Sequence, residues 1–501
     1  MLTTLLAALA LQAAPPAAQA DAADHGDPEA PTGQAVPVVD YEAAGREALA
    51  RRLALEPRPG PARNVIVFVA DGMDVTTITA ARILAGQRAG GPGEDHALAF
   101  EALPRTALVK TYNTDAQVPD SAGTATAILS GRKTRAGVIN VDQRVERGDC
   151  EGAADARLET IADLAAAMGK STGVVTTARL THATPAALYA SSPDRDYESD
   201  ADLPKGSACT DVARQLIERR DALGLRVALG GGLRAFTPEG AGGKREDGRD
   251  LLAAWAEDGA VVTDAEALAA LDPAGEAPVL GLFADSHMAY EADRTDDEPS
   301  LADMTRFAIE ALSADEDGYV LLVEGGRVDH AHHAGNAARA LGDVLAFDEA
   351  VAAALDAVDL DETLVMVTAD HGHTLAFQGY PRRGNPVLGI VRSVGAEGDE
   401  PELAADGKPY TTLSYANGPG AQHVMRAGRP RPDVADDEAQ DVDYRQQSAI
   451  PAFSETHGGQ DVALFADGPG AAVVGGTMEQ NVLYFVVENA MKSGDSGATK
   501  P

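Results

Sequence analysis

The sequence predicts an α/β fold, with a doubly wound, mostly parallel central sheet between helices and a small inserted subdomain. Short β-branched apolar runs bounded by Gly and Asp recur along the chain. Such runs are typical of strands that are buried on both faces of a parallel sheet. From Asn64 to about Ala376 they alternate with amphipathic segments rich in Ala and Leu, which favours a doubly wound arrangement. Length alone, at 501 residues, would also allow several domains.

The predicted elements follow one another in a regular order. An Ala-rich helix is expected over residues 41–55, and Pro57, Pro59 and Pro61 separate it from the first strand. Apolar runs predict strands at residues 65–69, 173–177, 319–323, 364–368 and 462–465. Helical spacing predicts helices over residues 160–168, 213–220, 303–312 and 337–357.

We interpret residues 41–376 and 452–491 as one α/β domain that is interrupted once. The interrupting segment, residues 377–451, is rich in Gly, Pro and Asp and has no long periodic stretch. It is therefore expected to form a small subdomain at the rim, with a flexible linker as the alternative. Residues 21–40 are interpreted as an acidic linker, and residues 492–501 as a flexible tail.

The first 20 residues carry a short apolar stretch that ends in Ala18-Gln19-Ala20, a pattern typical of a cleaved export signal. This stretch is too short to span a bilayer, and no other is long and apolar enough. The sequence therefore predicts an exported protein, periplasmic or extracellular. Cys150 and Cys209 are the two cysteines, and in an oxidising compartment they could pair; two unpaired thiols are the alternative.

The charge balance excludes some classes of partner. The chain has 41 basic and 78 acidic residues, a formal net charge of −37, so nucleic acid and anionic membranes are not expected to bind. A phosphate-binding pocket in such a protein needs strong local cations, such as metal ions and a few Arg residues. The acidity fits a salty habitat and a requirement for solubility equally well.

Acidic, imidazole and hydroxyl side chains follow four of the predicted strands and precede a fifth. Because ligands collect at the carboxyl ends of parallel strands, we expect these side chains to meet at one edge of the sheet. Carboxylates and imidazoles delivered repeatedly to one edge predict a site with more than one metal ion. The candidates are Asp71, His182, Thr184, Glu324, Asp329, His333, Asp370, His371 and His457.

The spacing of these residues indicates which metals fit. Asp329 and His333 share one face if the chain is helical there, and a carboxylate with an imidazole suits zinc. His330 would then point elsewhere, towards substrate or towards groups behind the ligands. Thr and Glu ligands suit magnesium. We expect His182 and Thr184, two residues apart on an extended segment, to face the same way.

Ser121 and Arg195 are candidates for the chemistry itself. Ser121 opens the helix-like run SAGTATAILS, where a serine is usually only an N-cap. The alternative is a nucleophile favoured by the helix dipole and an adjacent cation. No G-x-S-x-G motif surrounds it, which argues against an α/β-hydrolase elbow. Arg195 is either a surface residue or a bidentate clamp for two phosphoryl oxygens.

Six segments together resemble the alkaline phosphatase family, from about residue 41 to about residue 491. They are VADGM (69–73), PDSAGTATAILSG (119–131), VVTTARLTHATPAALYA (174–190), VEGGRVDHAHHAGN (323–336), VTADHGHT (367–374) and ETHGG (455–459). The order and combination of these segments are specific to that family. The resemblance implies a mostly parallel central sheet between helices, a crown subdomain formed by residues 377–451, and usually a dimer.

The resemblance also implies two zinc ions and one magnesium ion per subunit. The first zinc would be bound by Asp329, His333 and His457. The second would be bound by Asp71, Asp370 and His371. Magnesium would be bound by Asp71, Thr184 and Glu324. Ser121 would be the nucleophile beside the second zinc, and Arg195 would clamp the phosphate.

Some residues resemble the animal-type members of the family. The matching residues are His182, His330, Cys150 and Cys209, the two cysteines corresponding to a disulfide. Animal-type members also bind a structural calcium. Here Ala284 stands where that pattern has Glu, which argues against a calcium site, although Glu298 could still supply one of its ligands.

The implied activity is hydrolysis of small phosphate monoesters through a covalent phosphoserine. The nearest alternative is a two-metal esterase of the same superfamily that acts on phosphodiesters or sulfate esters. A sulfatase needs C/S-x-P-x-R, which the segment after Ser121 lacks, and diesterases tend to lack a clamp such as Arg195. A non-catalytic exported protein that binds metal or phosphate is the other alternative, although every presumed catalytic position is filled.

Overall fold

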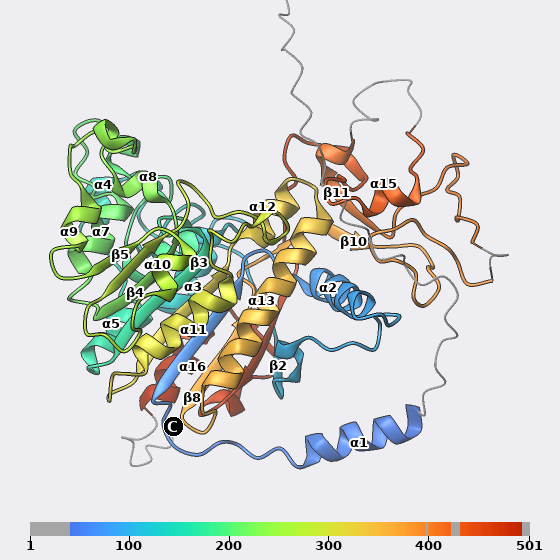
Figure 1. The fold of residues 1–501 in the computed structure, drawn as a ribbon, viewed down its shortest axis with the longest axis horizontal. Helices are drawn as coiled ribbons and strands as arrows, with labels where there is room; N and C mark the ends of the chain where they lie inside the picture. Colours follow the sequence, from blue (N-terminus) through green and yellow to red (C-terminus); the bar gives the residue numbers. More distant parts are fainter. Residues whose placement is uncertain (1–40, 396–398, 422–430, 493–501) are drawn as a thin grey trace, which may run out of the picture. The chain divides into compact units, whose positions relative to one another are not determined.

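A ten-stranded sheet forms the centre of the computed structural model, which describes residues 41–395, 399–421 and 431–492 (Figure 1). The strand order is β15-β2-β14-β8-β1-β7-β3-β4-β6-β5. The strands from β8 to β5 in this order are parallel, whereas β14 is antiparallel to both of its neighbours. The sheet is mostly parallel, as predicted.

The strands of this sheet are buried on both faces where the sequence is most apolar. Every residue of β7 and β8 is buried, which explains their continuous apolar runs. The strand bounds are β1 Asn64–Ala70, β2 Arg105–Lys110, β3 Ser171–Arg179, β4 Leu225–Gly231, β5 Ala260–Val262, β6 Val279–Leu282, β7 Tyr319–Gly325, β8 Thr363–Thr368, β14 Val462–Asp467 and β15 Thr477–Glu479.

Helices cover both faces of the sheet. One group is α2 (Val75–Arg88), α11 (Leu301–Leu312) and α13 (Ala337–Ala357); α11 and α13 lie side by side across the strands in Figure 1. The other group is α3 (Ser121–Ser130), α5 (Ile161–Ala167), α6 (Ala183–Tyr189) and α16 (Val482–Lys492). The five predicted helices are found as α1 (Tyr41–Leu53), α5, α7 (Val212–Arg219), α11 and α13, within two residues at each end. The other helices of the described residues are α4 Cys150–Ala153, α8 Leu233–Phe236, α9 Leu251–Trp255, α10 Ala265–Ala269, α12 Arg327–His333 and α15 Asp436–Gln440.

Two small sheets lie outside the main one. The segment that interrupts the α/β domain contributes to a three-stranded sheet of β10 (Leu375–Phe377), β11 (Leu413–Gly418) and β12 (Ser448–Pro451). A second pair joins β9 (Gly372–His373) to β13 (His457–Gly458). The interrupting segment therefore contains regular structure of its own.

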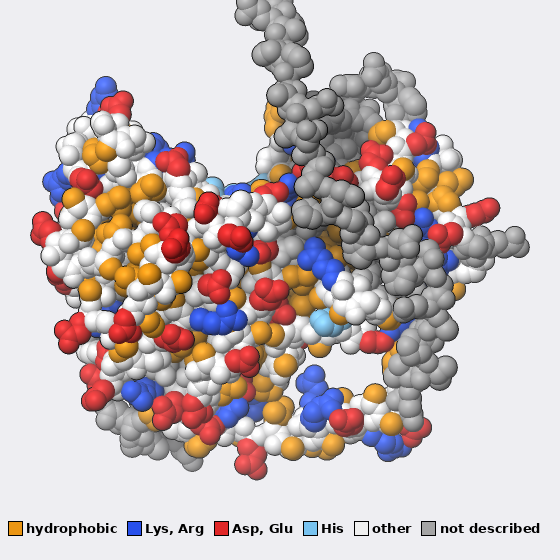
Figure 2. Space-filling model, in the orientation of Figure 1, with side chains coloured by type: hydrophobic (Ala, Val, Ile, Leu, Met, Phe, Trp, Pro, Cys, Tyr) orange, Lys and Arg blue, Asp and Glu red, His pale blue; other side chains and the backbone are white. Residues whose placement is uncertain are grey.

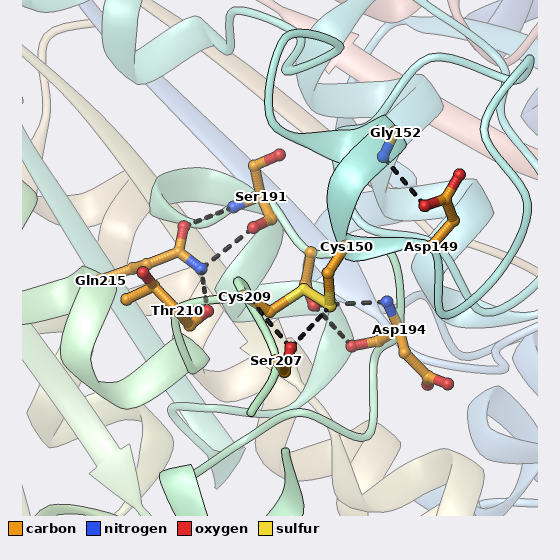
Figure 3. The surroundings of a disulfide bond; sticks show 10 residues. Asp149, Cys150, Gly152, Ser191, Asp194, Ser207, Cys209, Thr210 and Gln215 are labelled. Atoms are coloured by element: carbon orange, nitrogen blue, oxygen red, sulfur yellow. Dashed lines mark hydrogen bonds between the residues drawn. A yellow bond between two sulfur atoms is a disulfide. The ribbon is translucent and has the colours of Figure 1, made fainter. Parts of the chain in front are cut away.

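The drawn face of the surface is acidic, as the composition predicts, and the two cysteines are paired. Figure 2 shows Asp and Glu spread over the face that is drawn, with Lys and Arg between them and no continuous basic patch there. Cys150 at the start of α4 and Cys209 just before α7 form a disulfide (Figure 3), so the predicted pairing is confirmed. It ties α4 to the segment before α7, beside the Ser207 hydroxyl, which lies 3.0 Å from the Cys150 sulfur.

Some predictions fall on residues outside the described part of the chain. These are the export signal at residues 1–20, the linker at residues 21–40 and all but the first residue of the tail. Within the described residues, no helix combines the length and the apolar character that crossing a bilayer requires.

Candidate metal centre and active site

Neighbouring strands of the main sheet bring most of the candidate ligands to one edge. Val69 near the end of β1 is paired with Glu324 of β7 on one side and with Thr368 of β8 on the other. The carboxyl ends of these three strands are therefore level. Asp71 follows β1 directly, and Asp370 follows β8 after a single residue. The predicted edge is the place where ligands collect in parallel sheets.

Ser121 lies in contact with the candidate ligands that follow β1 and β8, which form a first group. Its Oγ is 3.1 Å from His371 Nε2 and 3.5 Å from Asp71 Oδ2. His371 Nε2 is in turn 3.2 Å from Asp71 Oδ1 and 3.4 Å from Asp370 Oδ2. Ser121 is the first residue of α3, whereas Asp120 is the N-cap and accepts from the backbone of the first turn. The Ser121 hydroxyl is therefore not used as a helix cap.

Asp329 is the centre of a second group. α12 places His333 one turn after Asp329, and their Oδ1 and Nε2 atoms are 3.2 Å apart. His457 Nε2 lies 3.3 Å from the same oxygen, and His373 Nε2 lies 2.8 Å from it. His373 was not among the predicted ligands. The available signal was its place in VTADHGHT, two residues after His371.

A short ladder explains how His457 reaches this group from the far side of the inserted segment. β13 pairs antiparallel with β9, so that His457 lies opposite His373 and Gly458 lies opposite Gly372. His457 Nδ1 is 2.8 Å from the carbonyl oxygen of Pro119, to which its N–H donates. The Nε2 atom therefore remains for a ligand.

A third group combines Asp71, Glu324 and His182, whose ligand atoms lie within 4.8 Å of one another. Burial raises the pKa of Glu324 to about 8, although a hydrogen bond from the Thr176 hydroxyl lowers it. The extended geometry expected for His182 and Thr184 was wrong. His182 is the N-cap residue of α6, and Thr184 lies in its first turn, because the chain turns helical directly after β3.

Arg195 reaches the site from a loop. Its Nη1 donates to Asp120 Oδ2 at 3.0 Å, and its Nη2 lies 3.0 Å from His182 Nε2. The Arg195 side chain is only 18% exposed, so the interpretation as a surface residue was wrong. The His330 ring lies 5.4 Å from that of His182, between ring centroids. Both rings therefore lie on the Arg195 side of the site.

The site has the donor chemistry and the electrostatics of a metal centre. Burial, reinforced by the charge of Asp370, raises the pKa of Asp71 well above its usual value. Crowded buried carboxylates repel one another unless cations neutralise them. Within the described residues, several buried atoms also lack a hydrogen-bond partner: Asp71 Oδ1, His182 Nδ1, Thr184 Oγ1, Glu324 Oε1 and His371 Nδ1. Oxygen and nitrogen donors without thiolates fit zinc and magnesium.

At the calcium position considered from the sequence, Glu298 has a different partner. Its Oε2 accepts a hydrogen bond from Ala289 N at 2.9 Å. None of the groups with metal-ligand geometry among the described residues contains Glu298. These groups are Asp329 with His333, His373 and His457; Asp71 with His182 and Glu324; and Asp71 with Asp329 and His371.

Several known proteins are similar to this chain in sequence. A family model described as alkaline phosphatase matches residues 62–493. The tissue-nonspecific alkaline phosphatase of Felis catus is 41% identical over 450 residues, which cover 85% of this chain and 83% of that protein. The membrane-bound alkaline phosphatase of Bombyx mori is 42% identical over 442 residues, which cover 84% and 78%.

Solved structures show the same fold. The alkaline phosphatase of Thermus thermophilus is 28% identical, with a TM-score of 0.62, and the match covers 88% of this chain and 93% of that one. The enzyme of the Antarctic bacterium TAB5 is 22% identical, with a TM-score of 0.60 and coverage of 86% and 99%. The chain therefore belongs to the alkaline phosphatase family, enzymes that hydrolyse phosphate monoesters.

Proposed function

We propose that the chain hydrolyses small phosphate monoesters through a covalent phosphoserine, with Ser121 as the nucleophile. The observation that carries this proposal is the position of the Ser121 hydroxyl, 3.1 Å from His371 Nε2 and 3.5 Å from Asp71 Oδ2. A buried serine whose hydroxyl faces candidate metal ligands instead of capping its helix is suited to activation.

The groups of ligands support two zinc sites and one magnesium site. The first zinc would be held by Asp329, His333 and His457. The second would be held by Asp71, Asp370 and His371. Magnesium would be held by Asp71, Thr184 and Glu324, with His182 close by. When bound, these ions supply positive charge that favours an ionised serine and stabilises the oxygens entering and leaving phosphorus.

The protein side chains would position and transfer the phosphoryl group. Ser121 Oγ, which lies beside Asp71 and His371, loses its proton to solvent water and forms a bond to phosphorus as the bond to the alcohol oxygen breaks. The departing alcohol oxygen takes up a proton from water. Water then cleaves the phosphoserine, which releases inorganic phosphate and restores the hydroxyl. Arg195 offers its guanidinium to the equatorial oxygens, while Asp120 holds that guanidinium in place.

Arg195 favours monoesters over diesters, because a monoester presents an additional free oxygen to a bidentate clamp.

We further infer a homodimer. α1 has no buried residue, and Tyr380, Ile450 and Phe453 expose large apolar side chains, with Phe453 99% exposed. These surfaces are available to a second copy of the chain. Export to the periplasm or the cell exterior agrees with the disulfide.

A direct test compares p-nitrophenyl phosphate with bis(p-nitrophenyl) phosphate, using protein of measured zinc and magnesium content. We expect fast turnover of the monoester, loss of that turnover with a chelator, and a loss of at least about a thousandfold in Ser121→Ala with both zinc ions retained. Ser130→Ala, a serine at the other end of α3, is the matched control. A faster diester rate, or a fully active Ser121→Ala protein, would refute the proposal.

A further inference from the structure

The three-stranded sheet β10-β11-β12 lies directly beside the Asp329 group. β10 begins two residues after His373, and β12 ends four residues before Glu455. β11 contains Tyr415, which is 2% exposed. The chain therefore passes from this small sheet into the metal centre at two places.

Glu455 holds two of the imidazoles that surround Asp329. Its Oε2 is 2.6 Å from His373 Nδ1, while His373 Nε2 is 2.8 Å from Asp329 Oδ1. The Glu455 backbone oxygen accepts a hydrogen bond from His333 Nδ1 at 2.6 Å. That bond places the His333 proton on Nδ1 and leaves Nε2 facing Asp329. One residue thus orients both rings towards the same carboxylate.

The Glu455 carboxylate is itself fixed. It is 1% exposed, and its Oε1 accepts from both the backbone N–H and the hydroxyl of Thr374, at 2.7 and 2.5 Å. A carboxylate with these bonds has no freedom to turn away from His373. It therefore fixes the His373 ring relative to Thr374, the residue just before β10.

Tyr415 supports the same ring from its face. Its hydroxyl lies 2.8 Å from His332 Nδ1. The His332 ring is stacked on His373, with 4.7 Å between ring centroids and 29° between planes. The Thr77 hydroxyl, 3.2 Å from His332 Nε2, completes the hydrogen bonding of this ring. His373 is thus held at its edge by Glu455 and on its face by His332.

We infer that Glu455, which lies just after the inserted segment, is a positioning residue for the first zinc site, and that Tyr415 of the inserted segment supports the same site through His332. Groups that hydrogen-bond to metal ligands fix the ligands' orientation, and their loss typically lowers metal affinity by about 10- to 100-fold. The residues proposed for the second zinc, Asp71, Asp370 and His371, have no contact with Glu455 among the bonds described above. The inference rests on the proposed zinc assignment.

The test measures zinc retention against a graded chelator in wild-type protein, Glu455→Gln and Tyr415→Phe. We expect Glu455→Gln to lose one of its two zinc ions at about 10- to 100-fold lower chelator strength, with the other zinc retained. Tyr415→Phe should show a smaller shift in the same direction. In both variants, saturating zinc should restore kcat. Glu402→Gln is the matched control, since Glu402 lies in the inserted segment, as Tyr415 does, and accepts a hydrogen bond from the Tyr410 hydroxyl at 2.7 Å.

The outcomes separate this inference from the proposed function. Equal zinc affinity in Glu455→Gln and wild type, or equal weakening of both zinc ions, overturns the inference and leaves the proposed function standing. Wild-type protein that binds no zinc overturns the zinc assignment itself. If Glu455→Gln does not fold, Thr374→Val removes only the hydroxyl that anchors Glu455. It should weaken the same zinc by a smaller factor, and wild-type retention would refute the inference.

Discussion

Metal removal should make the stability of this protein fall steeply as pH rises. The reason lies at Glu324, a buried ligand of the proposed magnesium site, whose pKa is about 8 instead of its usual value of 4.5. Without metal, the folded chain holds a proton there that the unfolded chain has already released. A carboxyl whose pKa is raised by folding contributes stability at low pH and loses it between its unfolded and folded pKa values.

The magnitude follows from these two pKa values. A difference between about 8 and 4.5 corresponds to a loss on the order of 5 kcal/mol of unfolding free energy between about pH 4.5 and pH 8. Asp343 in α13 offers an internal comparison, because burial raises its pKa to about 8 as well. Asp343 is not one of the proposed metal ligands, so its contribution should persist when metals are bound.

Urea unfolding of four proteins from pH 5 to pH 9, each with and without zinc and magnesium, tests this reasoning. The proteins are wild type, Glu324→Gln, Asp343→Asn and the double variant. Glu324→Gln should flatten the pH slope of the metal-free protein only, whereas Asp343→Asn should flatten the slope in both states. If the slope of the metal-free protein is the same in wild type and Glu324→Gln, the electrostatic account of the site is wrong.

Two further predictions concern arginines. Arg195→Lys should raise KM for p-nitrophenyl phosphate and weaken inhibition by inorganic phosphate by about 10-fold or more, because Lys cannot form the bidentate contact; unchanged phosphate inhibition would exclude the clamp. Arg245 is fully buried and bonds Asp211 at 2.8 and 3.1 Å. Arg245→Ala should therefore lower the unfolding free energy by about 3–5 kcal/mol, because it leaves a buried carboxylate unpaired. Exposed Arg306→Ala is its control, and equal losses in the two variants would contradict this.

The sequence predicted the parts of the site that follow the periodicity of the sheet. Asp71 and Asp370 come directly after continuous apolar runs, so the rule for carboxyl ends of parallel strands places them correctly. Asp329 and His333 were paired by helical spacing, and α12 provides that helix. These placements depend on local geometry alone, which single-sequence patterns encode.

Residues that depend on contacts between distant segments were missed. His373 and Glu455 touch each other across the β9–β13 ladder, and no spacing rule relates two positions on either side of an inserted segment. Gly72 is a similar case. Its φ is 81°, and a Cβ there would lie 2.5 Å from the His373 ring, so the glycine is required by a ring that comes much later in the chain. His182 was misjudged because helix α6 begins directly after it.

The acidity of the chain is compatible with its action on phosphate esters, because the charge of the surface carboxylates and the charge of Arg195 act over different distances. Surface carboxylates that account for the net charge of −37 are screened beyond about 8 Å at physiological ionic strength. Arg195 acts at contact, and its low exposure keeps its field from being screened in the same way. The carboxylates of the site are themselves the proposed cation ligands. Local negative charge therefore assembles the positive field that a phosphoryl group requires, instead of opposing it.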